Sequence, residues 1–176
     1  MENRIMHHIV RTVLLPLCCL AALALPLRAQ EKQTDLYDPS ADAAAALREA
    51  RTRATAEHKH VLVQVGGNWC SWCRKLDKLI AGNDTLRALV DDNYVLVRVN
   101  YSKENRNREV LAALDFPQRF GFPVLVVLDA AGRRLHTQDS GLLEGGGAHD
   151  PDKVRGFLMQ WTPKAVDPAT YRDADR

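Results

Sequence analysis

A pair of cysteines separated by two residues lies where the sequence predicts that a strand becomes a helix. Residues 61–65, Val-Leu-Val-Gln-Val, form a mostly β-branched apolar run that is typical of a buried strand. Residues 74–80 carry apolar side chains at helical spacing. Cys70 and Cys73 stand between these two segments, so the strand delivers both thiols to the beginning of the helix. No other feature of the chain restricts its fold as strongly.

This position has chemical consequences for both thiols. Cys70 is expected in the first turn of the helix, where unpaired backbone N–H groups and the helix dipole stabilise an anion. A cysteine in such a motif commonly has a pKa below the value of about 8.5 for a free thiol, and only the thiolate is nucleophilic. Cys73 lies on the same helix face, at a Cβ separation of roughly 5–6 Å that modest adjustment brings within disulfide range. We therefore predict that Cys70 attacks a disulfide and that Cys73 resolves the mixed disulfide.

Two motifs in the right order resemble those of the thioredoxin superfamily. Residues 61–73 are similar to its strand, its Trp-Cys-x-x-Cys sequence and its active-site helix. Residues 120–123, Phe-Gly-Phe-Pro, followed by the apolar run 124–128, resemble its cis-proline loop and the next strand. The resemblance extends over about residues 41–161. It implies a thioredoxin-like α/β fold, a three-layer sandwich in which a mixed central sheet carries helices on both faces.

The same resemblance implies an activity and the residues that carry it. The activity is thiol-disulfide exchange on protein thiols or disulfides, with Cys70 and Cys73 as the catalytic pair. A cis bond before Pro123 turns backbone groups towards an extended substrate peptide, and this loop keeps metal ions from the thiols. The residues expected to bind substrate are Trp69, Ser71, Trp72, Phe122 and Pro123. We expect no cofactor and no metal, only a redox partner in the membrane, and we expect a monomer.

Two departures from the thioredoxin pattern bear on how the chain works. Gln64 stands where thioredoxins usually carry a buried acid that helps to deprotonate the second cysteine, and glutamine cannot exchange a proton near neutral pH. Ser71 and Trp72 replace the Gly-Pro of thioredoxin itself, at positions that tune a reduction potential spanning about 150 mV in such proteins. The sequence does not give the direction of electron flow, although we favour reduction. The rival hypothesis is a non-catalytic binding or chaperone module that uses the cis-proline groove.

The N-terminal segment is predicted to be a secretory signal peptide. Two arginines give a basic start, the uncharged apolar run 12–27 follows, and cleavage is expected after Ala29. The apolar run is shorter than the ~20 residues of a spanning helix. An uncleaved membrane anchor and a lipoprotein anchored through Cys18 or Cys19 are the alternatives. We therefore expect an exported protein in a bacterial periplasm.

Removal of this segment changes both the charge and the cysteine content. It takes away three of the 24 basic residues and one of the 22 acidic residues, so the mature chain is formally neutral and nothing favours a nucleic-acid partner. It also takes away two of the four cysteines and leaves Cys70 and Cys73 alone in an oxidising compartment. A lone vicinal pair can cycle there. The alternative is a static local disulfide, although closing so short a loop stabilises a fold little.

The mature chain is long enough for one domain. Residues 30–40 are a polar lead-in, 41–162 form the thioredoxin-like domain, and 163–176 are a polar tail. The alternating run 94–100 is expected as a central strand. The Gly-rich stretch 140–150 is expected as a flexible loop that lies near the active site.

Two histidines raise a metal hypothesis. His58 and His60, together with Cys70 and Cys73, are a familiar zinc-binding set. A strand that rises about 3.3 Å per residue separates the histidines from the cysteines, so the geometry argues against a shared metal. We expect both histidines to be solvated loop residues.

Overall fold

The computed structural model describes residues 35–172. The predicted signal peptide, residues 1–29, and the first part of the polar lead-in lie outside the described residues. In chain order the main elements are α1 (Ala43–Glu57), β1 (His60–Gly66), α2 (Ser71–Gly82), α3 (Asp84–Asn93), β2 (Tyr94–Asn100), α4 (Arg108–Ala113), β3 (Val124–Leu128), β4 (Arg134–Asp139), β5 (Glu144–Gly145), β6 (Ala148–His149), α5 (Pro151–Gln160) and α6 (Pro163–Val166). Short 3-10 helices span Pro117–Phe120, Ser140–Leu143 and Pro168–Thr170.

Four strands form one mixed sheet in the order β2-β1-β3-β4. β1 pairs with β2 in parallel, whereas β1 with β3 and β3 with β4 pair antiparallel. A parallel neighbour requires a crossover, and α2 and α3 supply it between β1 and β2. This is the mixed α/β architecture that the sequence predicts.

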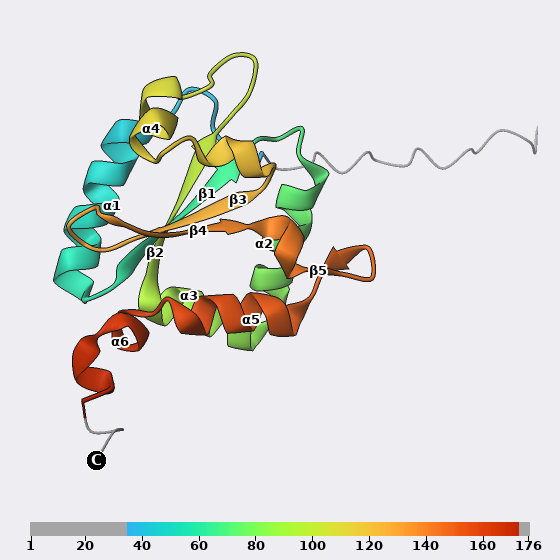
Figure 1. Ribbon diagram of the computed structural model, residues 1–176. Helices are drawn as coiled ribbons and strands as arrows, with labels where there is room; N and C mark the ends of the chain where they lie inside the picture. The colour runs from blue at the N-terminus through green and yellow to red at the C-terminus, as the bar shows by residue number, and fades with distance from the viewer. Residues whose placement is uncertain (1–34, 173–176) are drawn as a thin grey trace, which may run out of the picture. The chain divides into compact units, whose positions relative to one another are not determined.

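Helices cover both faces of the sheet (Figure 1). The odd-numbered valines of β1, among them Val61 and Val63, share a core cluster with α1 and α4. Leu62 points to the opposite face and shares a second cluster with α2, α3 and α5. Successive side chains of a strand alternate between faces, so one apolar strand supplies both cores. The alanine face of α1, with Ala50 and Ala54 buried, allows this helix to pack closely on the sheet.

Polar side chains define where the helices begin. Asp42 accepts a hydrogen bond from the backbone N–H of Ala45 at 2.9 Å and caps α1. Asn83 caps α3 in the same way, and it breaks the segment after the cysteines into two helices, as the sequence indicates. Among the described helices, none has both the length and the apolar character needed to cross a membrane.

The strand at 94–100 is an edge strand, so its expected place in the centre of the sheet is wrong. β2 lies at one end of the sheet formed by the described strands and pairs only with β1. It resembles a central strand in sequence because helices cover both of its faces and bury most of its side chains. Burial by helices and burial by neighbouring strands leave the same apolar pattern.

The expectation for the two histidines holds for one of them. His58 is exposed at the C-terminal cap of α1. His60 is buried, and its Nδ1 lies 2.9 Å from the carbonyl oxygen of Trp161, so it is not a solvated loop residue. The reason is that β1 begins at His60 itself and the end of α5 covers this end of the sheet. Among residues 35–172, no group of three or more metal-ligating side chains is assembled.

Candidate active site

The two cysteines form a disulfide at the N-terminus of α2. Cys70 is the N-cap residue, one position before the helix, and its Sγ accepts a hydrogen bond from the backbone N–H of Cys73 at 3.1 Å. The Cα atoms are 5.3 Å apart, within the usual range for a disulfide. Cys70 keeps 4% of its surface exposed and Cys73 none. An anionic sulfur at the N-cap is stabilised by the same free N–H groups as one in the first turn.

One side of the disulfide is aromatic, and we call Trp69, Trp72 and Phe122 the aromatic side. Trp69 is more than half exposed, and its indole N–H donates to the carbonyl of Tyr101 at 2.7 Å. The ring of Phe122 meets Trp69 edge-on at 5.2 Å between centroids and stacks on Tyr101 at 4.9 Å. Phe122 also packs against the cluster that contains Cys70 and Cys73. Two of the predicted substrate-binding residues, far apart in sequence, thus meet beside the disulfide.

Trp72 connects the aromatic side to the Gly-rich stretch. Its ring meets that of His149 edge-on at 5.3 Å, and the ammonium group of Lys75 lies 4.0 Å above it. Lys75 also donates to the carbonyl of Gly147 at 3.0 Å. The stretch expected as a flexible loop is a short 3-10 helix followed by the β5–β6 hairpin. Its contacts with Trp72 and Lys75, on either side of Cys73 in sequence, place it near the cysteines.

His149 is a buried histidine whose ring nitrogens have no hydrogen-bond partner among the described residues. Burial lowers the pKa of its imidazole, the carboxylate of Glu144 opposes this shift, and the charge of Lys75 adds to it. The ring is therefore neutral at neutral pH.

The remaining predicted residues take separate places. The Phe122–Pro123 peptide bond is cis, and Pro123 is buried at the start of β3, where its carbonyl accepts a hydrogen bond from the hydroxyl of Ser140. Ser71 is exposed at the first position of α2. The structure therefore brings Phe122 and Trp72 against the cysteine cluster, while Ser71 faces solvent.

The other side of the disulfide is polar, and we call Tyr37, Gln64 and Asn68 the polar side. Tyr37 is 1% exposed and belongs to one cluster with both cysteines. Gln64 donates through Nε2 to the hydroxyl of Tyr37 at 2.9 Å. Sequence reasoning assigned the lead-in 30–40 no role, whereas the compact unit begins at Asp35. The adjacent Leu36 and Tyr37 in a mostly polar segment were the available signal.

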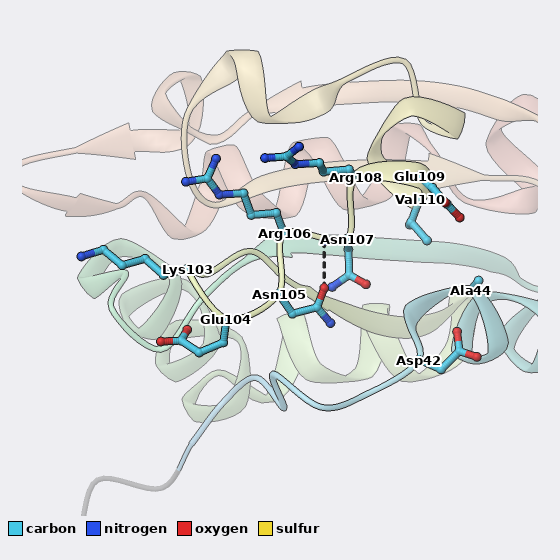
Figure 2. Close-up of a pocket in the computed structure, with 10 residues that line it drawn as sticks. All are labelled: Asp42, Ala44, Lys103, Glu104, Asn105, Arg106, Asn107, Arg108, Glu109 and Val110. Carbon is cyan, nitrogen blue, oxygen red and sulfur yellow. Dashed lines mark hydrogen bonds between the residues drawn. The ribbon is translucent and has the colours of Figure 1, made fainter.

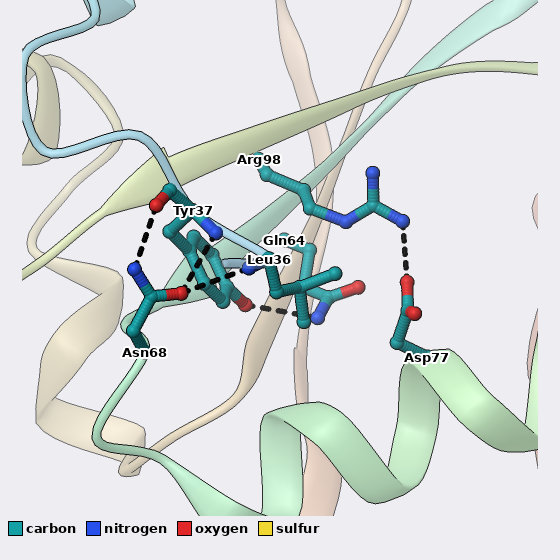
Figure 3. A network of polar contacts seen from close by, with 6 residues as sticks. All are labelled: Leu36, Tyr37, Gln64, Asn68, Asp77 and Arg98. Atoms are coloured by element: carbon teal, nitrogen blue, oxygen red, sulfur yellow. Dashed lines mark hydrogen bonds and ion pairs between the residues drawn. The ribbon is translucent and has the colours of Figure 1, made fainter. Parts of the chain in front are cut away.

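Asn68 holds the segment that carries Tyr37. Its Oδ1 accepts from the backbone N–H groups of Leu36 and Tyr37 at 2.9 and 3.0 Å, and its Nδ2 donates to the carbonyl of Tyr37 at 2.8 Å (Figure 3). Asn68 lies two residues before Cys70. The loop that presents the cysteines therefore also fixes the chain that covers them from behind.

Beyond Gln64 lies an ion pair. Gln64 and Arg98 are register partners on β1 and β2, and Arg98 pairs with Asp77 of α2. Figure 3 shows Gln64 between Tyr37 and this ion pair. Arg98 is thus partly exposed and ion-paired, and its partner follows Cys73 by one helical turn.

The absence of a side chain at Gly66 leaves space for the Sγ of Cys73 and the hydroxyl of Tyr37. A Cβ atom at this position would come within 2.5 Å of the Sγ of Cys73 and 2.6 Å of the hydroxyl oxygen of Tyr37. Real Cβ atoms do not approach other atoms so closely. Glycine is therefore required here by close packing at the exit of β1.

A separate depression lies between the start of α1 and the loop before α4 (Figure 2). Its lining includes none of the predicted site residues. Within it, Asn105 donates to the carbonyl of Pro39 at 3.0 Å, which gives the N-terminal segment a second anchor. Its charged lining residues carry both signs and are Asp42, Lys103, Glu104, Arg106, Arg108 and Glu109.

Comparisons with known proteins agree with this geometry. A family model described as thioredoxin-like matches residues 42–130, about half of the chain. The disulfide bond reductase DsbH of Chlamydia pneumoniae is 29% identical over 119 residues, which cover 62% of this chain and 69% of that protein.

Solved structures agree as well. A disulphide isomerase from Xylella fastidiosa Temecula1 superposes with a TM-score of 0.65 at 28% identity, over 73% of this chain and 97% of that one. A thioredoxin from Thermus thermophilus has a TM-score of 0.50 at 17% identity, over 71% and 90% of the two chains, and this likeness concerns the fold alone.

Proposed function

Because this chain belongs to the thioredoxin-like family, we propose that it is an exported thiol-disulfide oxidoreductase that acts on disulfides of other proteins. The observation that carries the proposal is the cysteine pair at the N-terminus of α2, with Phe122 of the cis-proline loop packed against it. A nucleophile at a helix N-terminus beside a peptide-binding loop is suited to disulfide exchange.

The reductive half-reaction follows from the exposure of the two sulfurs. Cys70 is the more accessible, so its thiolate attacks the substrate disulfide, one substrate sulfur leaves as a thiol, and a mixed disulfide forms. Cys73 then attacks the Sγ of Cys70, the bond between Cys70 and the substrate breaks, and the second substrate sulfur leaves as a thiol. The two electrons that reduce the substrate come from the two cysteines. The protein is left with the Cys70–Cys73 disulfide, which a membrane redox partner reduces.

Direction and location are part of the proposal. We favour reduction, and the name of the chlamydial relative supports this direction, whereas the name of the Xylella protein supports isomerisation. Export is supported by the sequence of residues 1–29, which lie outside the described residues. Protein disulfides or thiols are the substrates, no cofactor is needed, and the protein acts as a monomer.

The reduction potential tests the direction. The mature protein is equilibrated with dithiothreitol or glutathione buffers while the fluorescence of Trp69 and Trp72 is followed. A potential near the thioredoxin value of about −270 mV supports a reductant. A potential of about −120 to −180 mV supports an oxidase or isomerase and contradicts the reductive proposal.

A second candidate is a non-catalytic binding or chaperone module. It is favoured by Gln64, which provides no proton acceptor for Cys73. A pair that stays oxidised under strong reductant, or a Cys70 thiol that is alkylated no faster than free cysteine, supports this module and contradicts the oxidoreductase.

A further inference from the structure

A buried tyrosine hydroxyl lies close to the disulfide. Tyr37 shares a cluster with both cysteines and is 1% exposed. Its hydroxyl oxygen and the Sγ of Cys73 lie 2.6 and 2.5 Å from the same point, where a Cβ on residue 66 would stand. The hydroxyl and the sulfur of the resolving cysteine therefore border one small space.

The hydroxyl has a proton to donate there. Its oxygen accepts the hydrogen bond from the amide of Gln64 at 2.9 Å, and its own proton finds no acceptor among the described residues. Burial raises the pKa of Tyr37 far above its ordinary value, an effect that the hydrogen bond from Gln64 and the charge of Arg98 only partly offset. Tyr37 is therefore a neutral hydrogen-bond donor across the physiological pH range, and it is no base.

We propose that Tyr37 is a positioning residue of the redox pair, whose hydroxyl donates a hydrogen bond to the Sγ of reduced Cys73 and stabilises the resolving thiolate. The proposal rests on the proposed oxidoreductase function. In the mixed disulfide, Cys73 loses its proton to water, and the thiolate attacks the Sγ of Cys70. The Cys70–Cys73 bond forms, the bond from Cys70 to the substrate breaks, and the departing sulfur takes a proton from water. Tyr37 keeps its own proton throughout.

The surroundings hold Tyr37 in place for this role. Asn68 binds both backbone groups of Tyr37 (Figure 3), and Asn105 donates to the carbonyl of Pro39. Gln64, which cannot replace the acid of thioredoxins as a base, instead orients the hydroxyl. A hydrogen bond donated by Tyr37 and a carboxylate that accepts a proton both favour the thiolate form of Cys73, by different means.

The charged groups near the pair come from several elements. Arg74, directly after Cys73, donates to the carbonyl oxygen of Asn68 at 3.0 Å. Arg98 and Asp77 form their ion pair beyond Gln64. Lys75 and His149 contact Trp72, and the charge of Glu144 opposes the lowering of the His149 pKa by burial. All six groups stay unchanged in the variants below, so a shift in pH dependence reports the hydroxyl.

The test uses the reduced full-length mature chain and 5,5′-dithiobis(2-nitrobenzoate), which releases one coloured thiolate when Cys70 attacks and a second when Cys73 resolves. Tyr37→Phe keeps the ring and removes the hydroxyl. Because a hydrogen bond to a charged group is worth roughly a tenfold effect or more, we expect the second phase to slow about tenfold. We also expect its pH midpoint to rise by about one unit, while the first phase is unchanged.

Tyr94→Phe is the matched control. Tyr94 is also buried, but its hydroxyl donates to the carbonyl of Leu158, in the core around α5. We expect both phases to stay as in the wild type. Equal slowing of both phases in Tyr37→Phe, or a slower second phase with an unchanged pH midpoint, overturns the proposal and leaves Tyr37 a packing residue.

A second variant covers the case in which Tyr37→Phe fails to fold. Site-specific 3-fluorotyrosine at position 37 keeps the size of the ring nearly unchanged and makes the hydroxyl a stronger donor. We expect the pH midpoint of the second phase to fall, and an unchanged or higher midpoint contradicts the proposal. Absence of the second release in the wild type would instead contradict the oxidoreductase function itself, so the two failures are distinguishable.

Discussion

The aromatic side of the disulfide is open at Trp69, whereas the polar side is closed. On the aromatic side, rings contact rings, and more than half of the Trp69 surface meets solvent. On the polar side, Tyr37 and Gln64 are buried and joined by a hydrogen bond. The difference indicates a division of tasks between access to the sulfurs and control of their reactivity.

The sulfurs themselves should give the largest effect, because both sides act only through them. Cys70→Ser removes the attacking thiol, and we expect the reduction of a protein disulfide to fall to the uncatalysed rate. Cys73→Ser keeps the attack and loses the resolution, so a mixed disulfide with Cys70 should accumulate, visible by mass spectrometry under non-reducing conditions. Accumulation in Cys70→Ser and not in Cys73→Ser would reverse the two roles.

Filling the space between the two sides should come next. In Gly66→Ala, the new methyl group meets the Sγ of Cys73 and the hydroxyl of Tyr37, and overpacking of this kind costs about 1–3 kcal/mol of unfolding free energy. Urea denaturation measures the loss. Gly156→Ala in α5 is the control, since its methyl group meets open space and should stabilise the helix by about 0.5–1 kcal/mol. Equal stability of Gly66→Ala and wild type would contradict the close packing.

Lowering the pH should decrease the free energy of unfolding through His149, which contacts Trp72 of the aromatic side. Because burial lowers the pKa of this histidine in the folded state, the unfolded state binds more protons as the pH falls below about 6.5. The stabilisation is fully present above that pH and is lost below it, with a slope of at most about 1.4 kcal/mol per pH unit. We expect His149→Phe to remove this part of the pH dependence between pH 7.5 and 5.5 in denaturation experiments. An identical pH profile for the variant would show that His149 does not titrate in this range.

Truncation of the exposed ring should have the smallest effect. In Trp69→Ala we expect the KM for a protein substrate to rise about fivefold, because an aromatic contact at an interface contributes roughly 1 kcal/mol. The rate with a small disulfide such as oxidised glutathione should stay unchanged. If the small disulfide were affected as strongly as the protein substrate, Trp69 would act on the sulfurs and the division between the two sides would fail.

The aromatic side could be predicted from the sequence because contiguous motifs encode it. Trp69 and Trp72 each directly precede a cysteine, and Phe122 belongs to a four-residue motif with a proline. The resemblance to a family with a known fold implied that the proline faces the cysteine pair, and the mixed sheet with its two helical layers is confirmed.

The polar side could not be predicted because no local pattern encodes it. Gln64 was recognised as unusual, but its partner Tyr37 lies 27 residues earlier in a segment without periodicity. The buried position of His60 and the edge position of β2 could not be predicted either. Each depends on which distant element covers the residue, and an apolar or polar pattern does not specify that element.

The shared space at Gly66 also has an evolutionary consequence. A relative in which this position gains a side chain has no room for both the cysteine sulfur and a phenol ring behind it. Gly66 and Tyr37 should therefore be kept or lost together among related chains, although 29 positions separate them. Joint retention of Gly66 and Tyr37 would mark a subgroup in which a tyrosine packs against the disulfide. This subgroup would be recognisable from sequence alone.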